Sequence, residues 1–150
     1  MSLAVGEKAP EFSLSSTGGG QVALSDFVGR PVVLVFYPGD DTPVCTKQLN
    51  SYNDGLDQFE ALDAQVLGIS AQSIESHDKF AGKHGFKFPL LADPDKKVAA
   101  MYGTLGPIGF PRRSVFVIDA TGVVRYAHRA IAGLTYRPVA ELVEALKNLA

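Results

Sequence analysis

Hydrophobic positions along the chain form short continuous runs separated by segments with helical periodicity. The unbroken apolar run over residues 32–37 predicts a buried strand, because a strand covered on both faces needs no polar alternation. Similar runs predict strands over residues 65–70, 88–91, 114–118 and 123–128. Turn residues Thr121 and Gly122 separate the last two runs, which are therefore expected to form a hairpin.

Helical patterns fill the intervals between those strands. Pro43 suits the first position of a helix, since its missing N–H group would have no partner there. Further helices are predicted over residues 73–84, ending at Gly85, over residues 94–102, ending at Gly103, and from residue 138 onward. Alternating strands and helices predict an α/β fold, a central sheet flanked by helices, and the late hairpin predicts some antiparallel pairing.

The first 30 residues contain two short β-prone runs, EFSL and QVAL, separated by three glycines. This arrangement predicts an N-terminal hairpin with residues 18–20 as its loop. The alternative, a phosphate-binding glycine loop, would need a helix after the glycines, and a strand-like run follows instead.

Composition is typical of one compact domain over residues 1–150, since 46% of the residues are hydrophobic and no repeat or linker divides the chain. A net charge of -2 gives no reason to expect nucleic acid as a partner. The longest apolar stretch is about six residues, against the roughly 20 that a membrane span needs. The first ten residues lack the pattern of a secretory signal, so we expect a cytoplasmic protein.

Cys45 is the only cysteine, which excludes an internal disulfide and favours a reducing compartment. With Thr42 as N-cap, Cys45 falls in the first helical turn, where unpaired N–H groups and the helix dipole favour the thiolate. A structural role is the alternative, because a buried cysteine would be ordinary on a helical apolar stripe. That stripe consists of Cys45, Leu49, Tyr52, Leu56 and Phe59.

Pro38, Thr42 and Cys45 have the spacing P-x-x-x-T-x-x-C, which resembles the active-site signature of the peroxiredoxins. The surrounding FYPGDDTPVCTKQ is most similar to the bacterioferritin-comigratory, or Q-type, branch. The resemblance extends to GEKAPEFSL, LSDFVGRPVVLVFYP, KFPLLADPDKKVAAMYG and RRSVFVID, and so to nearly the whole chain. It implies a thioredoxin-like fold, with a central mixed sheet and an N-terminal β-hairpin extension.

The resemblance also implies thiol peroxidase chemistry on hydrogen peroxide or organic hydroperoxides. The Cys45 thiolate would attack the terminal peroxide oxygen and become a sulfenic acid, with no metal and no organic cofactor. Arg113 matches the family's arginine at the start of a strand and would support the thiolate. Alternation along that strand directs the neighbouring Arg112 to the opposite face. The groups expected to hold the peroxide are Thr42, Arg113 and the amides of Val44 and Cys45. Pro38 would shield the thiolate and shape the loop.

Other polar residues complicate this picture. Carboxylates disfavour a nearby thiolate, so Asp40 and Asp41 would oppose activation if both faced the sulfur. The three histidines show no metal-ligand spacing, and we interpret each as solvent-exposed; they are His77, His84 and His128. A Cys–His hydrolase that uses His128 has no family pattern in its favour.

Many Q-type relatives have a second cysteine five positions after the first, where this chain has Asn50, and others have one in a later helix. The chain therefore resembles a one-cysteine peroxiredoxin, whose sulfenic acid an external thiol must reduce. Thioredoxin, glutaredoxin or a low-molecular-weight thiol would serve, and the protein would be a monomer or homodimer. The alternatives are a thioredoxin-like thiol-exchange protein and a redox-sensing or chaperone protein without fast peroxide turnover.

Overall fold

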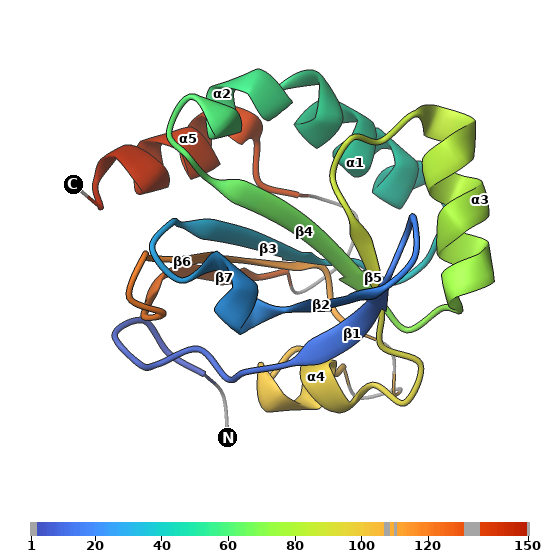
Figure 1. The fold of residues 1–150 in the computed structure, drawn as a ribbon, viewed down its shortest axis with the longest axis horizontal. Coiled ribbons are helices and arrows are strands. Elements are labelled where there is room, and N and C mark those ends of the chain that lie inside the picture. The colour runs from blue at the N-terminus through green and yellow to red at the C-terminus, as the bar shows by residue number, and fades with distance from the viewer. Residues whose placement is uncertain (1–2, 107–108, 110, 131–135, 150) are drawn as a thin grey trace.

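A mixed β-sheet forms the centre of the protein (Figure 1). The computed structural model describes residues 3–106, 109, 111–130 and 136–149. In these residues the sheet has seven strands in the order β2-β1-β5-β4-β3-β6-β7. The strands are β1 (Ser13–Ser16), β2 (Gln21–Ala23), β3 (Val32–Phe36), β4 (Gln65–Ser70), β5 (Leu90–Ala92), β6 (Ser114–Ile118) and β7 (Val124–Arg129).

Helices cover both faces of the sheet. In Figure 1, α1, α2 and α5 lie along one face, α4 lies on the other, and α3 packs beside β5. The helices are α1 (Pro43–Asp54), α2 (Leu56–Glu60), α3 (Ile74–His84), α4 (Lys97–Met101) and α5 (Val139–Lys147), with a 3₁₀ turn η1 (Leu24–Phe27). The predicted α/β class, with helices on both faces of a mixed sheet, is confirmed.

The central position of β3 explains its unbroken apolar sequence. It pairs in parallel with β4 and antiparallel with β6, and all five of its residues are buried. Val33 and Val35 pack on the face covered by α1, whereas Leu34 and Phe36 pack on the face covered by α4. The strand is thus buried on both faces, and it ends directly before the loop that leads to α1.

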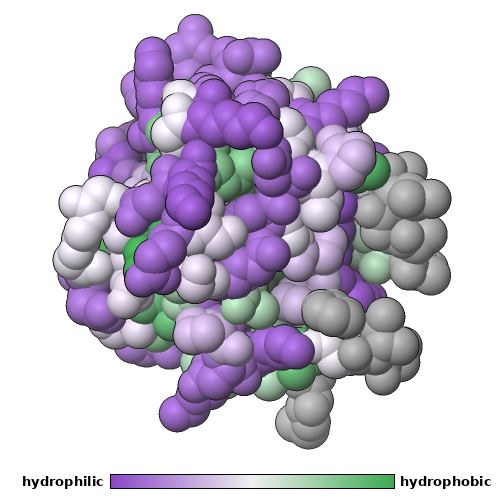
Figure 2. Space-filling view, turned by 90° about the vertical axis from the view of Figure 1, so that its right-hand side faces the viewer, coloured by the Kyte–Doolittle hydropathy of each residue, from purple (hydrophilic) through white to green (hydrophobic). Residues whose placement is uncertain are grey.

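The N-terminal hairpin is confirmed. β1 and β2 pair antiparallel, and all three glycines of the loop have positive φ angles, which only glycine adopts at little cost. β1 also pairs with β5, so the hairpin extends the main sheet. Seen from the side on which α3 lies, the surface is mainly hydrophilic, with hydrophobic side chains in small separate patches (Figure 2).

Two predicted elements differ from the structure. The helix predicted over residues 94–102 is only α4, because Lys96 takes a left-handed conformation at its N-cap and Asp93 accepts hydrogen bonds from the Val98 and Ala99 amides. The strand predicted over residues 88–91 is β5, shifted toward Ala92, where it pairs with both β1 and β4.

The apolar stripe of the first helix is confirmed as a buried face, but it continues across a break. α1 ends at Asp54 and α2 begins at Leu56, with Gly55 between them. A Cβ atom on Gly55 would lie 2.9 Å from Cγ1 of Val139, so glycine lets α5 pack closely against the break. Among the described residues, no helix is long and apolar enough to cross a membrane.

Candidate active site

The chain places Cys45 in the first turn of α1, as predicted. Thr42 is the N-cap with extended backbone angles, and Pro43 is the first helical residue. The amides of Val44 and Cys45 therefore belong to the first turn, where no preceding helical carbonyl is available to accept them. Cys45 is a free thiol with 0% exposure, and it packs in the core between the sheet and α1.

Arg113 lies beside this sulfur. Its Nη2 donates to Cys45 Sγ at 3.3 Å, and its side chain is buried, with the residue 3% exposed. The contact follows from the sheet register, because Ser114 of β6 pairs with Phe36 at the end of β3. Arg113 thus precedes β6 where β3 leads into the loop of Cys45. A guanidinium at this distance can donate to a negatively charged sulfur.

Arg112 lies on the other side of the sheet. Val115 and Val117 share the core of Cys45, so strand alternation places Arg113 with them and Arg112 opposite. On that opposite face, the guanidinium of Arg129 lies 4.9 Å from the centre of the Phe116 ring. Burial and the nearby Arg112 lower the pKa of Arg129. The structure thus agrees with the predicted division between the two neighbouring arginines.

A buried amide fixes the arginine and was not predicted from the sequence. Gln48 accepts from Nη1 of Arg113 at 2.6 Å and donates to the Tyr52 hydroxyl, which in turn donates to the carbonyl of Arg137 at 2.7 Å. Burial raises the pKa of Tyr52 to about 12, so it remains a neutral donor. Gln48 follows Cys45 by three residues, and an amide at that spacing beside an apolar helical stripe is the signal that could have identified it.

Thr42 uses its hydroxyl differently from the prediction. The N-cap position is confirmed, but no helix amide donates to the side chain; the hydroxyl instead donates to the carbonyl of Gly39 at 2.9 Å. The amides of Val44 and Cys45 are thereby left uncapped by Thr42. Thr42 itself is exposed, and Pro38, directly before Gly39, is half-buried.

The two aspartates of the loop have partners other than the sulfur. The Asp40 carboxylate accepts from the hydroxyls of Tyr37 and Ser76, each at 2.7 Å, and lies 2.6 Å from Nδ1 of His77. Burial would raise the pKa of Asp40, but hydrogen bonds from His77 and Tyr37 outweigh it and lower the pKa. Asp41 accepts from the exposed Lys83.

The predicted exposure of His77 is wrong. Its side chain is fully buried, with Nδ1 against Asp40 and Nε2 3.0 Å from the carbonyl oxygen of Leu91. The face of α3 that carries His77 packs against β5. His77 is therefore buried, although α3 is rich in polar residues. His84 and His128 are partly exposed.

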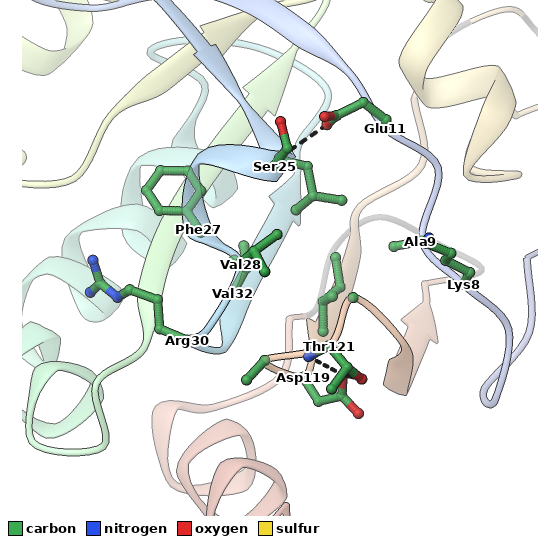
Figure 3. A pocket seen from close by; sticks show the side chains of 14 residues that line it. Lys8, Ala9, Glu11, Ser25, Phe27, Val28, Arg30, Val32, Asp119 and Thr121 are labelled. Atoms are coloured by element: carbon green, nitrogen blue, oxygen red, sulfur yellow. Dashed lines mark hydrogen bonds between the residues drawn. The ribbon is translucent and has the colours of Figure 1, made fainter.

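The described residues contain no group of three or more His, Cys, Asp and Glu side chains that could hold a metal ion. A cavity of about 350 Å³ lies at the other end of the sheet, between η1 and the β6–β7 turn (Figure 3). Its lining includes Phe27, Val28 and Val32, the first residue of β3, but not Cys45 or Arg113. The cavity is therefore separate from the candidate site.

Comparison with known proteins identifies similar chains. The model of the AhpC/TSA family matches residues 5–127. A protein of Oryza sativa subsp. japonica named "Peroxiredoxin Q, chloroplastic" is 39% identical over 96% of this chain and 65% of its own length. The "Putative peroxiredoxin bcp" of Coxiella burnetii is 39% identical over 83% of this chain and 87% of its own length. This chain therefore spans about 65% of the length of the rice relative.

A solved structure has the same fold. A cysteine-to-serine mutant of PrxQ from Xylella fastidiosa superposes with a TM-score of 0.90 at 30% identity, covering 99% of this chain and 98% of that one. The agreement extends over the sheet and its flanking helices.

Proposed function

Because this chain belongs to the AhpC/TSA family and to its peroxiredoxin Q branch, we propose that it is a thiol-dependent peroxidase. The Cys45 thiolate attacks the terminal oxygen of a hydroperoxide; an S–O bond forms as the O–O bond breaks. The leaving oxygen takes up a proton from solvent and departs as water or an alcohol, while the terminal oxygen keeps its hydrogen and Cys45 becomes a sulfenic acid. The observation that supports this most directly is the Arg113 guanidinium 3.3 Å from Sγ in the first turn of α1.

The groups around the sulfur would hold the peroxide in line for this displacement. Since the Thr42 hydroxyl gives its proton to Gly39, its lone pairs are oriented to accept a hydrogen bond from the peroxide O–H. The amides of Val44 and Cys45 and the Arg113 guanidinium are donors for the oxygen on which negative charge develops. Pro38 shields the sulfur from bulk water on the loop side.

Reduction of the sulfenic acid would come from an external thiol. Its thiolate attacks the oxidised Cys45 sulfur; an S–S bond forms as the S–O bond breaks, and the leaving hydroxide takes a proton from solvent to become water. A second thiol then attacks the mixed disulfide, which restores Cys45 and leaves the reductant as a disulfide. Thioredoxin, glutaredoxin or a low-molecular-weight thiol has the required chemistry, and the cytoplasm is the compartment that keeps such thiols reduced. We propose the cytoplasm as the site of action on this ground.

The alternative thiol-exchange and redox-sensing or chaperone functions have less support. Thioredoxins exchange disulfides with a C-x-x-C motif, and Thr42 stands where their first cysteine would be. Stopped-flow oxidation of the reduced protein by hydrogen peroxide separates the functions. A peroxidase gives a second-order rate far above that of free cysteine, whereas a rate equal to that of free cysteine would refute peroxidase function.

Oxidation by peroxide without a reductant should modify Cys45 and form no intramolecular disulfide. Peroxide-treated protein is expected to contain Cys45 sulfenic acid and then, as oxidant increases, sulfinic acid, because no second cysteine can trap the first product. Mass spectrometry of the intact chain and of its peptides measures this directly. Loss of a thiol without added oxygen on Cys45 would contradict the proposed chemistry.

Asn50→Cys should introduce the second cysteine that many relatives have at this position, but a disulfide with Cys45 should form only slowly. Residues 45 and 50 both lie in α1, and five residues along a helix rise about 7.5 Å, beyond the roughly 4.4–6.8 Å between Cα atoms that a disulfide needs. We expect the bridge to form only as the helix unwinds, at a rate limited by that opening. Thiol titration after peroxide measures it, and bridge formation as fast as sulfenic acid formation would show that this turn of α1 is already loose.

A further inference from the structure

Asp40, in the loop that leads to Cys45, forms a buried pair with His77. The Asp40 side chain is 3% exposed and that of His77 is 0% exposed, and their nearest atoms lie 2.6 Å apart. Asp40 belongs to the loop between β3 and α1, and His77 belongs to α3. Neither side chain contacts the Cys45 sulfur, and neither takes part in the mechanism proposed above.

The hydrogen-bond partners define the charge of the pair. Nε2 of His77 faces the Leu91 carbonyl, which can only accept, so Nε2 carries a hydrogen. Asp40 receives hydroxyl hydrogens from Tyr37 and Ser76, which favour its carboxylate form. A carboxylate can only accept, so Nδ1 of His77 carries a hydrogen as well. Both ring nitrogens of His77 thus face acceptors, an arrangement that fits an imidazolium beside the Asp40 carboxylate.

Tyr37 keeps its role as donor in this cluster. Burial and the Asp40 carboxylate raise the pKa of Tyr37 well above its usual value, so its hydroxyl retains the proton that it gives to Asp40. Tyr37 directly follows β3 and packs in the core that includes Cys45. The pair is therefore attached to the strand before the loop as well as to α3.

The backbone of the loop around Asp40 is also held in place. The amide of Asp40 donates to the side chain of Gln72, which lies just before α3. On either side of Asp40 are Gly39, whose carbonyl accepts from Thr42, and Asp41, whose φ of 57° is uncommon for a residue other than glycine. A turn with this geometry persists where surrounding contacts fix it.

We propose that the hydrogen-bonded pair of Asp40 and His77 positions the loop between β3 and α1. By holding the turn against α3, it sets the place of the Thr42 hydroxyl and of the first amides of α1 relative to the Cys45 sulfur. This inference rests on the proposed peroxidase function, because it assigns the pair an effect on the rate of peroxide oxidation. Neither residue contacts the peroxide; each acts through the loop.

Variants at position 77 separate the hydrogen bond between Nδ1 of His77 and Asp40 from simple packing. The amide nitrogen of an asparagine takes about the place of Nδ1, and that of a glutamine about the place of Nε2. His77→Asn therefore keeps the donor to Asp40, whereas His77→Gln keeps only the donor to Leu91. We expect His77→Gln and Asp40→Asn to slow Cys45 oxidation by about 10- to 100-fold in stopped-flow measurements, and His77→Asn to stay within about threefold of the original chain.

Asp41→Asn is the matched control, because it removes a neighbouring carboxylate of the same loop that is half exposed and pairs with Lys83. Its oxidation rate should be unchanged. Equal rates for His77→Gln and the original chain, or equal slowing by His77→Asn and His77→Gln, would overturn the proposal.

A measurement on the original chain remains decisive if a variant fails to fold. Nuclear magnetic resonance of the His77 ring at neutral pH should show hydrogen on both ring nitrogens, and an unprotonated nitrogen would overturn the ion pair. Absence of fast oxidation in the original chain would instead refute the peroxidase function, and the ring signals would still report the charge of the pair. The two failures are thus distinguishable.

Discussion

Cys45→Ser should abolish peroxide reduction, with a loss on the order of 10⁶-fold, the lower range of enzymatic rate enhancements. Cys45 supplies the only thiol of the chain, and a serine hydroxyl at this position neither ionises near neutral pH nor forms a stable bond to the peroxide oxygen. Consumption of hydrogen peroxide in the presence of an excess of dithiothreitol measures the residual rate.

The control for this result is the thermal stability of the Cys45→Ser variant. Cys45 is fully buried and packs beside Leu49 and Tyr52, and serine occupies nearly the same volume. The variant should therefore unfold cooperatively at a temperature within a few degrees of the original chain. Peroxide turnover that survives the substitution in a folded protein would place the chemistry elsewhere. Prevention of client aggregation that survives it would support the chaperone alternative.

Local signals were sufficient to predict the surroundings of the cysteine. The unbroken apolar run of β3 has one physical explanation, a strand covered on both faces, and Pro43 is suited to the start of a helix. Both features depend on residues adjacent in sequence. The strand, the loop and the first turn of α1 are therefore where the sequence predicted them to within one residue.

The contact between Arg113 and Cys45 depends on a pairing that the sequence does not encode locally. The two residues are 68 positions apart, and they meet only because β6 pairs antiparallel with β3 in one register. A shift of one residue would have brought Arg112 to the sulfur side. The resemblance to the peroxiredoxins, and not the apolar pattern, identified Arg113 in advance.

The burial of His77 and Asp40 could not be predicted from the sequence. His77 and Asp40 stand in segments rich in polar residues, and a polar residue that will be buried with a partner looks the same in sequence as one that faces water. Only the packing of α3 against β5 distinguishes them. Gln48 was missed because its partner Arg113 lies 65 positions away in the sequence, although its spacing from Cys45 is a local signal.

Arg113→Ala should slow the oxidation of Cys45 by about 10²- to 10³-fold, which is the usual effect of removing one donor that stabilises developing charge. The guanidinium supports the thiolate before the reaction and the leaving oxygen during it, so the second-order rate constant contains both effects. Stopped-flow measurements at several pH values separate them, because loss of thiolate support alone is recovered as the pH rises.

Two further substitutions make this result specific. Arg113→Lys should give an intermediate rate, because lysine keeps the charge but lacks the fork that contacts Cys45 and Gln48 at once. Arg112→Ala removes the same charge from the adjacent residue on the opposite face of the sheet, so its rate should stay within about threefold of the original chain. If Arg112→Ala were the slower of the two alanine variants, the register that places Arg113 beside the sulfur would be wrong. Equal slowing by both would mean that net charge, and not the contact with Cys45, determines the rate.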